Sequence, residues 1–362
     1  MSRQGPDLTD PEKFKNYFDT RIDTIMPIQT QGDWGSCHLQ ASMAVVNETI
    51  GGAAIDTAYL LGAHQYELTL ETLKGEYASA LSESNPKKFN KKLEDMFKDG
   101  GTIFDDLRLL AGWTGKRVDS GSVPLFHTVE GEQNITHALV KKQFTTELSK
   151  VMNDIRVQRP PLTQAMEQVN SVYQKFFGPP MIDRLASSSV YRSAQVKIIE
   201  RLEDGQVKPS TDFRYEAGSV NKLKVQFDGN KKVVQGFKSV GIGIEFAVQR
   251  LPEEEISDFL IQKIGVEKTP LLLAMEFSKK MKDATAIGTF EWLNTSKIKP
   301  IGWHAMYVRG LKTEVVNGKK VVTGLEVANS YGTEKGVGGA FYIPIEKMKD
   351  LKFSLYDVLI NY

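Results

Sequence analysis

The only cysteine of this 362-residue chain lies in the stretch TQGDWGSCHLQASMAVV, residues 30–46. An apolar helical pattern begins directly after Cys37, in which Leu39, Met43, Val46 and Ile50 recur at helical spacing. A cysteine at a helix N-terminus meets the positive end of the helix dipole, which favours the nucleophilic thiolate. A lone cysteine is nevertheless more often a buried, inert thiol, so other residues must decide between the two.

A cysteine nucleophile needs a base that handles its proton, a residue that orients this base, and donors for the oxyanion. Among the five histidines, His304 lies in the alternating stretch GWHAMYVRGL, with Ala305 and Tyr307 on the opposite face of the expected strand. Asn329 follows 25 residues later, in the segment VANSYG. The order Cys, His, Asn therefore fits a nucleophile, a base and an orienting amide.

These segments resemble those of papain-like cysteine peptidases. The nucleophile segment is represented by Gln31, Gly32, Gly35, Ser36 and Cys37, the base strand by HAMYVRG, and the orienting motif by Asn329-Ser330-Tyr331-Gly332. The resemblance implies hydrolysis of peptide or amide bonds through a thioester, with Cys37 as nucleophile and His304 as general base and acid. Asn329 would fix the imidazole, and Gln31 would donate its side-chain amide to the oxyanion beside the backbone N–H of Cys37.

The resemblance also implies residues that contact substrate. Gly100 and Gly101 resemble the glycine pair along the family's cleft, where missing side chains let the substrate backbone pair with the enzyme backbone. The alternative for this pair is a turn between two helices. The remaining candidates for substrate contact are Gly35, Ser36, Trp303 and Tyr331.

Three positions depart from the family pattern. Trp34 replaces a cysteine that forms a disulfide in the family, in keeping with a chain that has one cysteine. His38 replaces the aromatic residue after the nucleophile, and we expect it to be a partly exposed wall residue of the cleft. Tyr331 replaces the tryptophan that shields the orienting hydrogen bond from water, and its smaller ring is expected to shield less completely.

The spacing of the motifs points to one branch of the family. His304 lies 267 residues after Cys37, against roughly 130–150 in the short enzymes. Bleomycin hydrolase and its bacterial relatives are similar in carrying a helical insert between these motifs. The segments DGGTIFDDLRLLAGWTG and FYIPIEKMKDLKFSLYDVLI also resemble parts of that branch. Only 33 residues follow Asn329, so endopeptidase action is expected as readily as the aminopeptidase action that a long C-terminal arm gives that branch.

The elements that must position these residues divide the chain into three parts. The first, residues 1–122, is expected to be a helical lobe that carries the nucleophile, with helices near 11–19, 56–64, 68–81, 87–97 and 103–113. The second, residues 123–238, is expected to be a mostly helical accessory insert, with helices over 137–155, 162–177 and 193–204 and a strand-like end with a turn at 228–229. The third, residues 239–362, is expected to be a β-rich lobe that carries His304 and Asn329, with a hairpin turn at Asn317-Gly318. The fold class is α+β, a papain-like two-lobed fold of a helical lobe and a β-barrel-like lobe with an inserted helical region.

Composition narrows the partners. The 46 basic and 45 acidic residues give a net charge of +1, so a nucleic acid is not the expected partner. The sequence contains neither a metal-ligand spacing nor a phosphate loop, so no cofactor is expected. No apolar run is long enough for a membrane span. The expected partner is a peptide or protein substrate, with a contact of the insert to a second copy or another protein left open. We expect a reducing, cytoplasm-like compartment, although a protein exported without a signal peptide would look the same.

Two other functions compete with a peptidase. One is an amidase, deamidase or acyl transferase that uses the same residues, and the other is an inactive papain-like fold that binds peptides or a protein. Among the other histidines, His137 is expected to lie in a helix, and His64 and His127 are expected to have no chemical role.

Overall fold

The computed structural model describes residues 10–23, 28, 31, 34–49, 60–66, 69–70, 73, 103, 106–107, 133–177, 193–201, 212–213, 223–224, 238–241, 244–278, 300–350 and 352–361. Gly100, Gly101, His127, the helix expected over 87–97 and the turn expected at 228–229 lie outside these residues. Helices and strands are both present, as the α+β class requires. None of the described helices is both long and apolar enough to cross a membrane.

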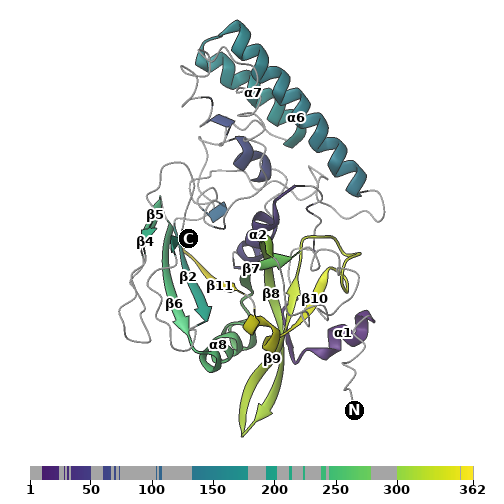
Figure 1. The fold of residues 1–362 in the computed structure, drawn as a ribbon, viewed down its shortest axis with the longest axis vertical. Coiled ribbons are helices and arrows are strands. Elements are labelled where there is room, and N and C mark those ends of the chain that lie inside the picture. Colours follow the sequence, from purple (N-terminus) through teal and green to yellow (C-terminus); the bar gives the residue numbers. More distant parts are fainter. Residues whose placement is uncertain are drawn as a thin grey trace.

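The described strands form a nine-stranded sheet (Figure 1). Its order is β10-β9-β8-β7-β11-β2-β6-β5, and β1 pairs with β8 beside this path. All pairings are antiparallel except that of β2 with β6. The strands are β1 (Thr20–Arg21), β2 (Ser193–Arg201), β5 (Lys238–Gly241), β6 (Ile244–Leu251), β7 (Leu271–Ser278), β8 (Pro300–Val316), β9 (Lys319–Ala328), β10 (Ala340–Pro344) and β11 (Phe353–Asn361). A separate pair is formed by β3 (Asp212–Phe213) and β4 (Leu223–Lys224).

The prediction of a helix over 193–204 is wrong, because residues 193–201 form strand β2. Ala194, Val196 and Ile198 are buried on one face of the sheet, and Ile199 is buried on the other. β-Branched residues favour strands, and this period of two fits a strand covered on both faces. The strand lies between β11 and β6, so this part of the predicted insert belongs to the same sheet as the strands of the last third.

The helices expected near 11–19, over 137–155 and over 162–177 are confirmed. α1 (Pro11–Tyr17) begins at Asp10, whose carboxylate accepts the backbone N–H groups of Glu12 and Lys13 at 2.9 and 3.2 Å. α2 (Cys37–Thr49) begins at the cysteine itself. α6 (Gln133–Gln158) and α7 (Leu162–Phe177) cover the two helices expected between 137 and 177, and His137 lies in α6. α8 (Glu253–Leu260) continues into a π-helical turn, η3 (Ile261–Val266), and a 3-10 helix, η5 (Ile345–Asp350), follows β10.

The hairpin predicted at Asn317-Gly318 joins β8 to β9. Both residues have positive φ, 52° for Asn317 and 77° for Gly318, which is the backbone of a two-residue type I′ turn. The register of the two strands runs from Val316 opposite Lys319 to Tyr307 opposite Ala328. The turn, together with two register shifts along the hairpin, therefore brings Asn329, which directly follows β9, close to His304 on β8.

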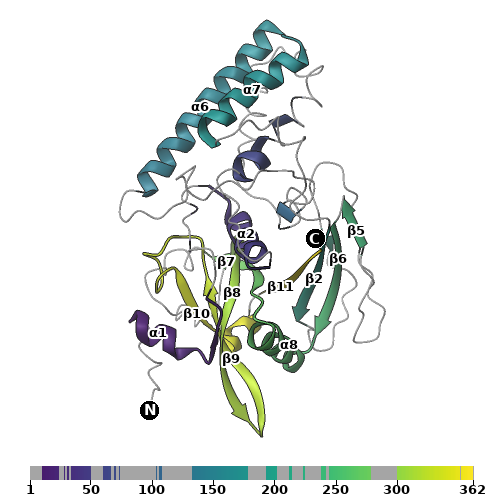
Figure 2. The ribbon, with the colours of Figure 1, turned by 180° about the vertical axis from the view of Figure 1, so that it is seen from behind.

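Two hydrophobic cores cover the two faces of the sheet. On one face α2, α6 and α7 pack together, and alternate strand residues such as Leu272 and Tyr307 point toward them. On the other face α8 and η3 pack against Leu273, Met306 and their neighbours. Figures 1 and 2 place α6 and α7 at one end of the molecule, with α2 between them and the sheet. The nucleophile helix is thus held from both sides.

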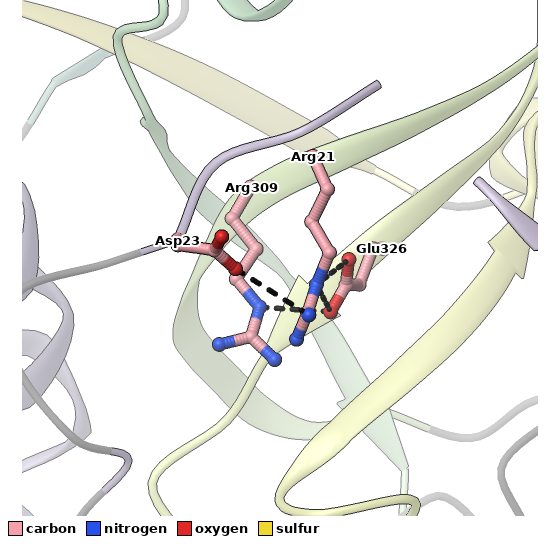
Figure 3. Close-up of polar contacts among 4 residues, drawn as sticks. All are labelled: Arg21, Asp23, Arg309 and Glu326. Atoms are coloured by element: carbon pink, nitrogen blue, oxygen red, sulfur yellow. Dashed lines mark hydrogen bonds and ion pairs between the residues drawn. The ribbon is translucent and has the colours of Figure 1, made fainter. Parts of the chain in front are cut away.

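A buried ion-pair cluster attaches β1 to the sheet (Figure 3). The fully buried carboxylate of Glu326 on β9 accepts Nε–H of Arg21 at 3.1 and 2.9 Å and Nε–H of Arg309 at 2.8 Å. Asp23 lies 3.5 Å from a terminal nitrogen of Arg21. A Cβ on Gly310 would lie 2.6 Å from the Glu326 carboxylate, so the cluster needs a glycine there. The chain just before the nucleophile segment is therefore anchored on the strands that carry His304 and Asn329.

Candidate active site

Cys37 is the first residue of α2 and is partly exposed. The helix packs against β7, β8 and β11, and its N-terminus lies beside His304 and Ala305 in the first half of β8. The side chain of His304 and the backbone N–H of Ala305, both on β8, lie close enough to the Cys37 sulfur to influence its ionisation. The predicted nucleophile and the predicted base, far apart in the sequence, therefore meet.

The imidazole of His304 is fixed on its other side by Asn329. Nε2 of His304 lies 2.7 Å from Oδ1 of Asn329, and the same Oδ1 accepts the backbone N–H of Ser330 at 2.7 Å. An atom that accepts a backbone N–H is the carbonyl oxygen of the amide, so Nε2 must carry a hydrogen. The nitrogen that remains to exchange a proton with the thiol is Nδ1, as a general base in this position requires.

Two aromatic rings contact the His304 imidazole. Tyr331 stacks on it, with ring centroids 4.9 Å apart and planes at 23°. Phe277 of β7 lies 4.6 Å from the imidazole and also contacts the Tyr331 ring at 6.2 Å. Sequence reasoning expected the tyrosine as a shield but missed Phe277, because the antiparallel register that places β7 beside β8 was not visible in the sequence. His304 is only 4 % exposed.

The local electrostatics favour a thiolate at Cys37. Burial by itself raises the pKa of this thiol, but the charge of His304 and its hydrogen bond lower it, and His38 and the Ala305 N–H lower it further. The net result is a pKa of about 6. Ordinary cysteine has a pKa near 8.5, so most of the Cys37 thiol is ionised at neutral pH, when unperturbed cysteine is still protonated.

Gln31 is bound to the orienting segment. Its backbone N–H donates to the carbonyl of Ser330 at 2.7 Å, and its side-chain oxygen accepts the hydroxyl hydrogen of Ser330 at 2.5 Å. Its Nε2 donates one hydrogen to the carbonyl of Trp34 at 3.0 Å. A primary amide has two N–H groups, so a second donor of this side chain is available beyond the bond to Trp34.

The other predicted contact residues differ in exposure. Trp303, the residue before His304, is 56 % exposed. Tyr331 and Gly35 are half-buried, and the side chain of Ser36 is buried. Trp303 and Tyr331 are thus the predicted contact residues with side chains that a substrate could reach, whereas Ser36 could contribute only through its backbone.

His38 is not the exposed wall residue that the sequence suggested. It is 6 % exposed, and its Nδ1 lies 3.0 Å from both carboxylate oxygens of Asp106. Ser42, one turn further along α2, donates its hydroxyl to the same carboxylate at 2.9 Å. The ring of His64 packs edge-on against His38 at 5.8 Å. The prediction failed because Asp106, 68 residues away in sequence, gives the imidazole a buried partner.

Trp34 anchors the nucleophile segment to the helical pair α6–α7. The indole is 3 % exposed and contacts the rings of Phe144 on α6 and Phe177 on α7, at 6.1 and 5.8 Å between centroids. Lys141 lies over the same indole at 5.4 Å. Trp34 stands where the papain-like pattern has a cysteine that forms a disulfide. In this chain, aromatic packing holds that position instead.

Comparison with known proteins supports the fold. No protein-family model matches the chain, and no curated protein sequence matches it. The solved structure of PepW from Lactobacillus rhamnosis HN001 aligns with a TM-score of 0.52 over 98 % of this chain and 85 % of that chain, at 12 % identity. Xylellain, a cysteine protease from Xylella fastidiosa, aligns over 24 % of this chain and 32 % of that chain, at 18 % identity and a TM-score of 0.18. The first likeness supports a papain-like fold, and the second is too limited to carry an argument.

Proposed function

We propose that this protein is a thiol hydrolase that cleaves peptide or amide bonds with Cys37 as nucleophile. The observation that carries the proposal is the arrangement of Cys37, His304 and Asn329, in which the imidazole lies beside the thiol and its Nε2 is 2.7 Å from the Asn329 amide oxygen. A structural thiol needs no base held in one tautomer. The finer placement, in the branch of bleomycin hydrolase and its bacterial relatives, rests on the sequence resemblance alone.

The reaction begins with attack of the Cys37 thiolate on the carbonyl carbon of the substrate. A C–S bond forms, and the electron pair of the carbonyl moves to oxygen. The backbone N–H of Cys37 and the second N–H of Gln31 donate to this oxyanion. When the carbonyl reforms, the C–N bond breaks, and the His304 imidazolium gives its proton to the leaving amine. The product of this half-reaction is a thioester on Cys37.

The second half-reaction uses water. Neutral His304 takes a proton from the water that attacks the thioester carbon, and Asn329 keeps the imidazole oriented during this step. Collapse of the second oxyanion releases the carboxylic acid and returns Cys37 as a thiolate beside a protonated His304. The substrate is proposed to be a peptide or protein, with the exposed indole of Trp303 available to contact it beside the nucleophile.

Alkylation of Cys37 tests the first requirement without a substrate. Because the chain has one cysteine, intact mass reports its reaction with iodoacetamide without ambiguity. We expect the rate to rise with pH, with a midpoint near pH 6 that follows the lowered pKa of Cys37. In His304→Ala the midpoint should move to the free-thiol range, at about 8.5 or above. A wild-type midpoint near that of a free thiol would favour the peptide-binding alternative.

Turnover is tested next, on a mixture of unlabelled peptides analysed by mass spectrometry. We expect new termini with the wild type and none with Cys37→Ala, which removes the nucleophile but keeps the helix. An activated thiol that cleaves no peptide but releases ammonia or transfers an acyl group would replace the peptidase with an amidase, deamidase or acyl transferase.

A further inference from the structure

A second imidazole–carboxylate pair lies beside the nucleophile. His38 directly follows Cys37 in α2, and its Nδ1 is 3.0 Å from both oxygens of Asp106. Asp106 is fully buried, and His38 is 6 % exposed. The catalytic steps proposed above use neither residue. A pair of this kind is costly to bury, so its position next to the only thiol calls for a physical explanation.

The buried carboxylate fixes the charge of the imidazole. A buried carboxylate needs a compensating positive charge or several strong donors. Ser42 supplies one neutral donor at 2.9 Å, and the other partner of this carboxylate among the described residues is His38. An imidazole that donates Nδ1–H between two carboxylate oxygens is stabilised in its protonated form by their negative charge. His38 is therefore expected to carry a proton and a positive charge at neutral pH.

We propose that His38, held as an imidazolium by Asp106, is a second cation that stabilises the Cys37 thiolate alongside His304. It is a positioning residue that acts through its charge and does not touch the substrate. The inference rests on the proposed function in that it takes Cys37 to be the nucleophile. It concerns the ionisation of that thiol, which can be measured whether or not the protein hydrolyses peptides.

The groups around the two residues are consistent with this role. Cys37 faces His304 on β8 and Tyr331 after β9, and His38 faces Asp106 and the ring of His64. His304 and His38 both lower the pKa of Cys37, the former more strongly. Two cations would also offset the cost of removing the Cys37 thiolate from water at the helix N-terminus.

Two substitutions give the inference a test of sign. In His38→Gln the side-chain amide can still donate to Asp106, but the positive charge is lost, so the midpoint of Cys37 alkylation should rise by about one pH unit. Asp106→Asn removes a negative charge. If that charge acted directly on Cys37, its removal would lower the midpoint of alkylation. If Asp106 acts by keeping His38 charged, the midpoint should instead rise. In the double variant, Asp106→Asn should add no further rise to that of His38→Gln.

Controls separate this effect from disturbed folding. Ser42→Ala removes a neutral donor from the same carboxylate and should leave the midpoint within a few tenths of a unit, while the thermal unfolding midpoint reports any loss of stability. For a variant that does not fold, histidine ¹⁵N NMR of the wild type gives the answer directly, because both ring nitrogens of an imidazolium carry hydrogen. Protonated His38 at pH 7 is the expected result.

The outcomes are distinct from those of the proposed function. A neutral His38 at pH 7, an unchanged midpoint in His38→Gln, or a lowered midpoint in Asp106→Asn would each overturn the inference. None of these results depends on a substrate. Conversely, a failure to cleave any peptide would overturn the peptidase while leaving a shifted alkylation profile in place.

Discussion

The hydroxyl of Ser330 donates to the side-chain oxygen of Gln31 at 2.5 Å, joining two residues that are 299 positions apart. The backbone N–H of Gln31 also donates to the carbonyl of Ser330. Gln31, the proposed oxyanion donor, is therefore held by Ser330, the residue that follows Asn329. One short segment after β9 thus fixes both His304 and Gln31, which links the position of the base to that of the oxyanion donor.

Ser330→Ala should separate these two roles. Loss of the hydroxyl removes one of the two hydrogen bonds that orient the Gln31 side-chain amide, and we expect kcat/KM to fall by about tenfold, less than the loss of a whole oxyanion donor. The midpoint of Cys37 alkylation should stay near pH 6, because His304 keeps its contacts. Ser330→Thr, which retains a hydroxyl, is the matched control. A shifted alkylation midpoint would mean that Ser330 acts on His304 instead.

Tyr331 should matter for its ring and not for its hydroxyl. The ring stacks on His304 at 4.9 Å, and burial raises the pKa of its phenol, so it stays neutral. Tyr331→Phe keeps the stacking and should retain kcat/KM within about threefold. Tyr331→Ala opens the bond between His304 and Asn329 to water and should lower kcat by more than about tenfold. Equal losses in the two variants would assign the role to the hydroxyl.

The residue types of the candidate site could be predicted because chemistry restricts them. A single cysteine, a histidine on an alternating strand and the Asn-Ser-Tyr-Gly segment led to Cys37, His304 and Asn329, and folding brings the three together. The order of these three residues along the chain can be read from the sequence without knowledge of any three-dimensional contact. Gly100 and Gly101 lie outside the described residues, so their role stays a prediction.

What could not be predicted depends on pairing over long sequence distances. The strand β2 was mistaken for a helix because its backbone hydrogen-bond partners in the sheet, β11 and β6, are more than 40 residues away along the chain. Phe277 reaches His304 only through the register of β7 with β8. The buried position of His38 depends on its contact with Asp106, which is 68 residues away. The sequence pattern of the helix itself does not show whether His38 is buried. Local periodicity contains none of these contacts.

The aromatic contact between α6 and the nucleophile segment should contribute to both stability and reactivity. Phe144 is fully buried and contacts Trp34, Tyr173 and Phe177. Phe144→Ala should lower the free energy of unfolding by about 3–5 kcal/mol, measured by urea denaturation. It should also slow Cys37 alkylation at pH 6, since Trp34 would lose its support. Leu139→Ala, at a 51 % exposed position on the same helix, should change stability by less than about 0.5 kcal/mol.

A cost to stability in Leu139→Ala equal to that in Phe144→Ala would contradict this assignment, because it would trace the effect to helix propensity along α6 and not to the packing on Trp34. Unchanged alkylation in a destabilised Phe144→Ala would show that the helical pair supports the fold without positioning the nucleophile.

Lys263 provides a test of pH dependence away from the site. Its Nζ lies 2.9 Å from the buried Asp357 and 2.8 Å from Glu267. Burial alone lowers the pKa of Lys263, but its hydrogen bond to Glu267 and the negative charges of both carboxylates raise it above its ordinary value. A raised lysine pKa stabilises the fold fully below the unfolded-state value of about 10.4, and this stabilisation is lost as the pH rises through the higher folded-state pKa.

Lys263→Met should therefore destabilise the protein by about 3 kcal/mol near neutral pH, because it leaves the Asp357 carboxylate buried without its cation. The double variant Lys263→Met with Asp357→Asn should recover much of this loss, since no buried charge remains. Urea denaturation between about pH 6 and about pH 12 measures both effects. The difference between wild type and Lys263→Met should stay constant up to about pH 10 and shrink above it. A difference that vanishes near pH 7 would mean that the lysine is already neutral there and that the ion pair does not hold Asp357.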